Sequence, residues 1–90
     1  MTDAQRRQVA LGDVDRERER QNRIHGEGEA NIVNRGAAQA LPALVEEVGE
    51  VARAMVERDH EAYRTELIHV AAVAVAMVEA HDKREQEARR

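Results

Sequence analysis

The segment from Leu67 to Val78 most constrains the fold of this chain, because its twelve residues are apolar apart from His69. A helix with apolar residues around its whole circumference is covered on all sides in a folded protein. The segment is too short to span a membrane, which takes ~20 apolar residues. No alternation of apolar and polar residues typical of β-strands is found elsewhere in the sequence. We therefore expect an all-α protein with this segment inside a helical bundle.

The chain is too short to cover such a helix easily with its own residues. Its 90 residues form one small domain, and a chain of this length buries only about 60–65% of its unfolded surface. Tyr63 is the sole aromatic residue, so small and aliphatic side chains must form the core by close helix packing. We therefore expect an antiparallel helical bundle that is completed by oligomerisation, as a dimer or tetramer.

Three helices are expected within a single domain over residues 1–90. The first covers residues 3–24, and residues 25–36 form a loop because they include three glycines and two asparagines. The second covers residues 37–58, with Pro42 tolerated in or near its first turn. The third covers residues 60–85, begins after Asp59 as the N-cap residue, and is followed by a frayed tail over residues 86–90.

Charge and composition limit the functions open to the chain. The net charge is −4, and residues 26–81 hold ten acids against four arginines. No basic face with interleaved aromatic residues is present, so nucleic acid is not an expected partner. The chain has no cysteine, which fits a reducing compartment, and the polar start MTDAQRRQ lacks the apolar core of a signal peptide. We expect a cytoplasmic protein that does not bind a membrane, and that binds phosphate compounds only through a cation.

The acids of the second and third expected helices are spaced for one shared site. Glu47 and Glu50 are three residues apart, as are Glu66 and His69, and residues at this spacing project side by side from a helix. Two antiparallel helices joined by a short turn can bring the two pairs together. Three carboxylates and an imidazole would suit a divalent cation. Taken singly, the glutamates also fit a solvated helix face, and His69 fits a hydrogen-bonded histidine of the bundle.

The second helix is amphipathic, and its acids lie opposite its apolar side. Glu46, Glu47 and Glu50 share the polar side, which is the solvated face if this helix is considered alone. Gly49 is expected to let another helix approach closely. The apolar residues fall within roughly 70° of one direction, and they are Leu41, Leu44, Val45, Val48, Val51, Ala52, Met55 and Val56.

Two motifs in this region resemble a known family. EEVGE at residues 46–50, then fifteen residues, then ELIH at residues 66–69 is similar to the MazG-like all-α nucleotide pyrophosphohydrolases, whose signature is EExxE, a spacer and ExxD. The similarity covers roughly residues 41–82 and is to the short, phage-type members. It implies that a nucleoside triphosphate, NTP or dNTP, is hydrolysed to the monophosphate and pyrophosphate.

The resemblance also implies roles for individual residues. By position, Glu47, Glu50, Glu66 and His69 would hold Mg²⁺ or Mn²⁺, and Glu46 or Glu47 would activate the attacking water. His69 stands where the signature has Asp, and a nitrogen ligand suits Mn²⁺ or Zn²⁺ better than Mg²⁺. Either the metal preference has changed, or the site is degenerate and the chain is a non-catalytic helical assembly module. A coiled-coil partner is disfavoured, because residues 3–24 lack sustained apolar heptads.

Three residues outside the signature are weaker candidates for contact with a substrate. The lead-in RERERQNRIHGEGE at residues 16–29 also resembles that of the short members, which implies that His25 stacks on a base. A loop histidine is the simpler interpretation. Lys83 and Arg84 follow the apolar run closely enough to meet phosphates from the helix end, although a solvated tail is the simpler interpretation for both.

Overall fold

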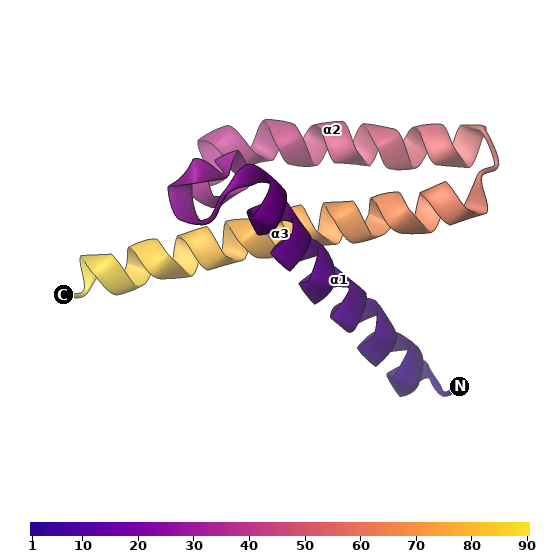
Figure 1. Ribbon diagram of the computed structural model, residues 1–90, viewed down its shortest axis with the longest axis horizontal. Helices are drawn as coiled ribbons and strands as arrows, with labels where there is room; N and C mark the ends of the chain where they lie inside the picture. Colours follow the sequence, from indigo (N-terminus) through magenta and orange to yellow (C-terminus); the bar gives the residue numbers. More distant parts are fainter.

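The protein is all-α, as expected from the sequence. The computed structural model describes residues 1–90, except for the side chain of Ala30. No strand occurs in this described part of the chain. Figure 1 shows the helices, which in chain order are α1 (Asp3–His25), η1 (Gly28–Ala30), η2 (Ile32–Arg35), α2 (Ala37–Val56) and α3 (His60–Ala88).

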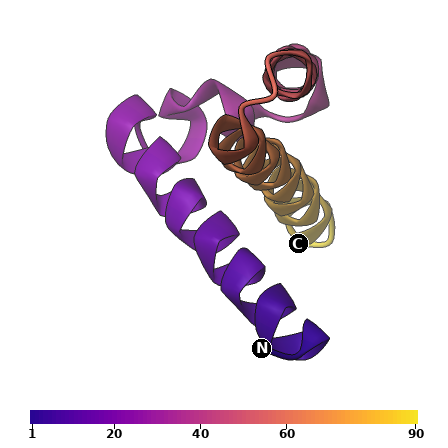
Figure 2. The same cartoon turned by 90° about the vertical axis from the view of Figure 1, so that its right-hand side faces the viewer.

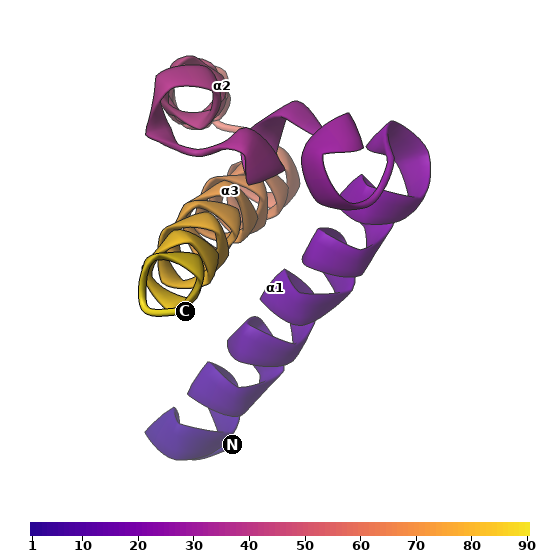
Figure 3. The same cartoon turned by 90° about the vertical axis from the view of Figure 1, so that its left-hand side faces the viewer.

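α3 is the central helix of the bundle. α2 and α3 run antiparallel and side by side, and α1 crosses α3 obliquely (Figures 1 and 2). Figure 3 shows α1 and α2 on different sides of α3, with the two short 3₁₀ helices leading from one to the other. None of the described helices combines the length and apolar character needed to cross a bilayer.

The ends of α2 and α3 follow local sequence signals. Asp59 caps α3, because its carboxylate accepts a hydrogen bond of 3.0 Å from the backbone N–H of Ala62. α2 ends at Val56, two residues before the expected position, whereas α3 stays helical to Ala88 and includes most of the expected tail. Pro42 lies in the second turn of α2 and removes one intrahelical hydrogen bond there.

Small residues form the contact between α2 and α3. Ala40 of α2 is buried against Val73 and Ala76 of α3, together with Val33 of η2. Side chains this short let the backbones of the two helices approach closely, in the absence of bulky rings. The core of a single chain is correspondingly small. Complete burial of one large apolar side chain contributes about 1.5–3 kcal/mol, so a larger interface would add stability.

α2 faces α3 with the side that carries Glu47, which would be the solvated face if this helix were considered alone. Ala40 and Ala54 are buried and Glu47 is half-buried, so the polar side of the helix points into the bundle. Most of the large apolar residues of α2 point outward in the single chain, whereas Leu44 packs against the core. The exposed fractions run from 49% to 83% for Leu41, Val45, Val48, Met55 and Val56.

α3 is likewise not covered on every side within one chain. Leu67 and Val78 are 40% and 59% exposed, and at 100° per residue they lie on the side of α3 turned away from α1. At 100° per residue, Leu41, Val48 and Met55 of α2 lie opposite Glu46, whose side chain lines the pocket beside α1, so they too are on the side turned away from α1. We call this surface the apolar face, and it comprises Leu41, Val45, Val48, Met55, Leu67 and Val78.

Arg18 ties the end of α1 to the loop and to α3. Its buried guanidinium donates to Oε2 of Glu79 at 2.8 Å and to Oδ1 of Asn34 at 3.0 Å. Asn31, also buried, donates to the carbonyl of Gln21 at 3.2 Å and accepts from the backbone N–H two residues later. The segment expected to be a loop is therefore held in place by polar contacts, and it forms one wall of the site described next.

Candidate metal centre

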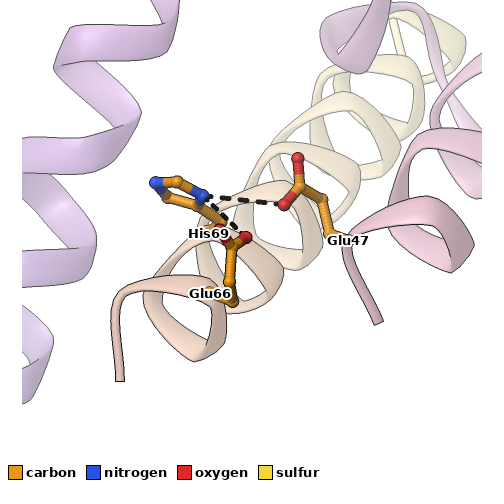
Figure 4. Close-up of side chains that lie close together, drawn as sticks. All are labelled: Glu47, Glu66 and His69. Atoms are coloured by element: carbon orange, nitrogen blue, oxygen red, sulfur yellow. Dashed lines mark hydrogen bonds and ion pairs between the residues drawn. The ribbon is translucent and has the colours of Figure 1, made fainter. Parts of the chain in front are cut away.

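Glu47 of α2 and Glu66 and His69 of α3 converge on one point between the two helices (Figure 4). One ligand atom from each residue lies within 4.8 Å of the other two. Nδ1 of His69 is 3.2 Å from Oε2 of Glu66 and 3.6 Å from Oε2 of Glu47. The antiparallel hairpin therefore joins a residue of the EEVGE motif to both polar residues of ELIH.

Glu47 is in an unfavourable electrostatic environment. Partial burial raises the pKa of its carboxyl, and the neighbouring carboxyl of Glu66 raises that pKa further, while His69 lowers it in part. A raised pKa means that the negative charge of Glu47 is not fully compensated by groups of the chain. A cation held between these residues would remove that penalty.

Glu17 of α1 is a third carboxylate beside His69, and no motif in the sequence predicts it there. The residue is buried, and its Oε2 lies 3.6 Å from Nε2 of His69. Arg20 holds the carboxylate with hydrogen bonds of 2.7 Å and 3.1 Å. In the run RERER, a Glu–Arg pair three residues apart looks like any solvated pair. Only the crossing of α1 over α3 brings Glu17 to the site.

A pocket of about 490 Å³ opens beside His69, between the end of α1, η2 and α2. Ile32 and Val33 contribute apolar surface to its wall, and Glu46 and His25 contribute polar groups. Glu46 and His25 are both exposed to solvent. Two of the residues expected from the sequence to contact water or substrate therefore line the same pocket as His69.

Glu50 is one turn beyond Glu47 but does not join the group. Its Oε2 lies 3.9 Å from Nη1 of Arg53 on the same helix, and its side chain is not among the ligand atoms that converge. The contact with Arg53 is long and exposed, and such pairs contribute only about 0–1 kcal/mol. Glu50 is therefore the one expected metal ligand that lies outside the group, in a contact that is easily broken.

Lys83 and Arg84 lie away from the acidic group. Both follow His69 by about four turns of α3. Lys83 lines a separate pocket near the end of α1, and Arg84 donates to the carbonyl oxygen of Arg35 and packs over Gly36. Gly36 has a φ of 102°, which side chains other than that of glycine rarely allow, and a Cβ there would require the guanidinium of Arg84 to shift. These contacts indicate that Arg84 helps to hold the start of α2.

The donor set fits a divalent cation. Ions such as Mg²⁺ and Mn²⁺ are held at about 2.0–2.2 Å, so two ligand atoms of one ion are at most about 4.4 Å apart. The atoms of Glu47, Glu66 and His69 lie within 4.8 Å of one another, and small side-chain movements would close the difference. This group has two carboxylates and one imidazole. The imidazole makes such a site more suitable for Mn²⁺ or a similar transition metal than a site with oxygen ligands alone would be.

No family model, no curated protein and no solved structure matches the chain. The functional proposal therefore depends on the geometry of the site and on the two motifs at residues 46–50 and 66–69.

Proposed function

We propose that the chain is a MazG-like, metal-dependent pyrophosphohydrolase that converts an NTP or dNTP to the monophosphate and pyrophosphate. The convergence of Glu47, Glu66 and His69 beside a pocket of about 490 Å³ supports this proposal most strongly. These three residues are the proposed ligands of Mg²⁺ or Mn²⁺, and Glu50 is a fourth candidate. The spacing of EEVGE and ELIH, which resembles the family signature, supports it further.

The reaction is a hydrolysis, with water as the nucleophile. The bound cation would offset the charges of the acids and of the phosphate oxygens. Glu46 and Glu47 line the pocket, and either carboxylate could accept the proton of the attacking water. The water oxygen bonds to the α-phosphorus, the bond to the β-phosphate breaks, and pyrophosphate leaves.

The pocket beside His69 is the proposed site of the nucleoside. Its wall includes the apolar side chain of Ile32 and the imidazole of His25, and a flat base can pack against both groups. Stacking of a base on an aromatic side chain contributes about 1–3 kcal/mol and tolerates different bases. We therefore expect His25 to contribute to the affinity for the substrate more than to the choice of base.

A panel of ribo- and deoxyribonucleoside triphosphates with Mg²⁺ or Mn²⁺ tests the proposal, with the products identified by phosphorus NMR. Monophosphate and pyrophosphate are the expected products. Glu66→Gln should lower the rate at least a hundredfold, because it removes a ligand, and Glu85→Gln on the exposed end of α3 is the matched control. Release of orthophosphate instead, or no hydrolysis with either metal, would contradict the proposal.

A non-catalytic assembly module is the second candidate function. His69 already contacts Glu17, Glu47 and Glu66 at 3.2–3.6 Å, and an imidazolium there would neutralise part of the acidic group without a metal. The observation to expect in this case is a melting temperature that does not respond to Mg²⁺ or Mn²⁺. The enzyme, in contrast, should be stabilised by any cation that binds only the folded state.

We further propose that the protein is a homo-oligomer, a dimer or tetramer, that buries the apolar face. Contiguous exposed apolar surface of this kind marks an interaction site in a soluble protein. Its six side chains are between 40% and 63% exposed, and covering them would contribute on the order of 5 kcal/mol per chain. A second copy offers the same two-helix surface, so two hairpins can cover each other. The pocket and α1 lie on the other side and stay open.

A further inference from the structure

A second groove lies on the other side of His69, between α1 and α3. Its volume is about 330 Å³, and arginines dominate its lining. Two acids, Asp13 and Glu17, offset part of that charge, which leaves the groove with two positive charges in excess when His69 is neutral. The whole chain has a net charge of −4, so the groove reverses the sign of its surroundings. The four arginines are Arg16, Arg20, Arg23 and Arg64.

The acids of the groove hold three of these arginines in place. Asp13 accepts hydrogen bonds from Arg64, at 2.7 Å, and from Arg16, and these bonds lower the pKa of Asp13. Glu17 holds Arg20 through both carboxylate oxygens. A guanidinium has five N–H donors, so one carboxylate leaves donors on each arginine for a ligand. The side chains of Arg16, Arg20 and Arg64 remain 46–69% exposed.

Arg23 supplies one of the two positive charges that the acids do not offset. It follows Arg20 by three residues and therefore lies on the same stripe of α1. It forms no ion pair with any residue that the structure describes. Its side chain is exposed at the edge of the groove. An anion in the groove would therefore meet Arg23 without displacing a partner.

We propose that this arginine groove binds an oligophosphate, and that it holds the β- and γ-phosphates of the substrate, which leave as pyrophosphate. The second part rests on the proposed function; the first does not. Guanidinium groups bind phosphate oxygens in pairs of parallel hydrogen bonds. Four of them around one groove suit a multiply charged phosphate chain better than a single carboxylate.

The position of the groove determines how a triphosphate would lie. Glu17, Arg20 and His69 line both the groove and the nucleoside pocket, so the acidic group is located where the two meet. A nucleoside in the pocket and a pyrophosphate group in the groove would leave the α-phosphate beside Glu47, Glu66 and His69. The groove also attracts a substrate that the ten acids of the middle segment would otherwise repel.

Calorimetric titration of pyrophosphate into the intact protein, in EDTA and at low ionic strength, tests the groove apart from the metal site. Arg23→Gln should weaken binding about fivefold, as for a charge-assisted hydrogen bond at a partly exposed site. Arg23→Lys keeps the positive charge but loses the paired N–H donors of the guanidinium, and it should weaken pyrophosphate binding less than Arg23→Gln does. Arg7→Gln removes the same charge from α1 outside the groove and should leave the affinity unchanged. Arg23 is exposed, so these variants should remain folded, and circular dichroism checks that they do.

Three results would overturn the proposal: no binding of pyrophosphate, equal losses in Arg23→Gln and Arg7→Gln, or citrate binding as tightly with the same dependence on Arg23. The two proposals can fail separately. If pyrophosphate binding depends on Arg23 but no triphosphate is hydrolysed, the proposal that the groove binds phosphate stands and the proposal of pyrophosphohydrolase activity is rejected. Hydrolysis to pyrophosphate with an unchanged KM and unchanged pyrophosphate affinity in Arg23→Gln would retain the enzyme and reject the groove.

Discussion

Nδ1 of His69 lies 3.2 Å from Oε2 of Glu66, one turn earlier on α3. This contact joins the residue that departs from the EExxE–ExxD signature to a residue that keeps it. The same nitrogen is 3.6 Å from Glu47 on the facing helix. His69 therefore either shares a cation with the two glutamates or takes the place of that cation, and the two arrangements predict different responses to metal.

The metal preference should depend on His69. If the imidazole is a ligand, the native protein should bind Mn²⁺ more tightly than Mg²⁺, and His69→Asp should shift the preference about tenfold or more toward Mg²⁺. Native affinity should also fall at acidic pH, because an imidazole must be deprotonated to bind metal. Titration of both ions into both proteins measures the effect, with His81→Asp on the exposed part of α3 as control. An unchanged preference in a folded His69→Asp variant would exclude His69 as a ligand.

Removal of the Glu47 charge should stabilise the metal-free protein at neutral pH. The folded-state pKa of Glu47 is raised, so the unfolded chain releases this proton first as the pH rises. The free energy of unfolding of the native protein therefore falls as the pH rises from the ordinary glutamate pKa to the raised pKa of Glu47. The Glu47→Gln variant does not titrate at this position and avoids that loss. In thermal melts in EDTA between about pH 4 and pH 8, the melting temperature of the variant should increase relative to that of the native protein as the pH rises. A variant that is less stable throughout would show that Glu47 has a structural partner.

Glu50 should join the site only when metal is bound. Its ion pair with Arg53 is long and exposed, so a cation near Glu47 could attract the carboxylate at little cost. Glu50→Gln should then weaken metal binding about tenfold, while Arg53→Gln should leave it unchanged or slightly stronger. Calorimetry with Mn²⁺ compares the two variants. Full affinity in Glu50→Gln would limit the ligands to Glu47, Glu66 and His69.

A charge in the apolar face should separate the subunits. Val45 is 63% exposed in the single chain, and Val45→Glu would bury an unpaired carboxylate in the proposed interface. We expect the dissociation constant of the oligomer to increase at least about a hundredfold, which corresponds to roughly 2.7 kcal/mol. Gln39→Glu adds the same charge to an exposed polar position of α2 and should not alter assembly. Sedimentation of the native protein as a stable, folded monomer at micromolar concentration would rule out the oligomer.

Arg18 should contribute more to stability than its partner Glu79. The side chain of Arg18 is buried, whereas that of Glu79 is 56% exposed and can be solvated after Arg18 is lost. Arg18→Leu removes the donors to Asn34 of the loop, to Glu79 and to two polar side chains of α1. It should cost about 2–4 kcal/mol, while Glu79→Gln should cost about 1 kcal/mol. Urea unfolding measures both, with Arg7→Leu as the control for an exposed arginine of α1. Equal stability of Arg18→Leu and the native protein would mean that this network does not anchor α1.

The local properties of the chain could be predicted from its sequence. Helical character follows from the apolar run of α3 and from the absence of alternating patterns, and the start of α3 follows from Asp59 as a cap. The pairing of Glu66 with His69 follows from their separation of three residues, because the helical period alone places them side by side. Each of these properties depends on neighbours within one or two turns.

The tertiary structure decided which surfaces of the helices meet. The period of α2 shows that Val45 and Val48 share a face, but α3 packs on the opposite face, where Ala40 and Ala54 permit a closer approach. Glu17 reaches His69 only because α1 crosses α3 at that level. A helical pattern specifies the residues that share one side of a helix. The side that is buried depends on how closely two surfaces fit, and that fit involves residues far apart in the chain.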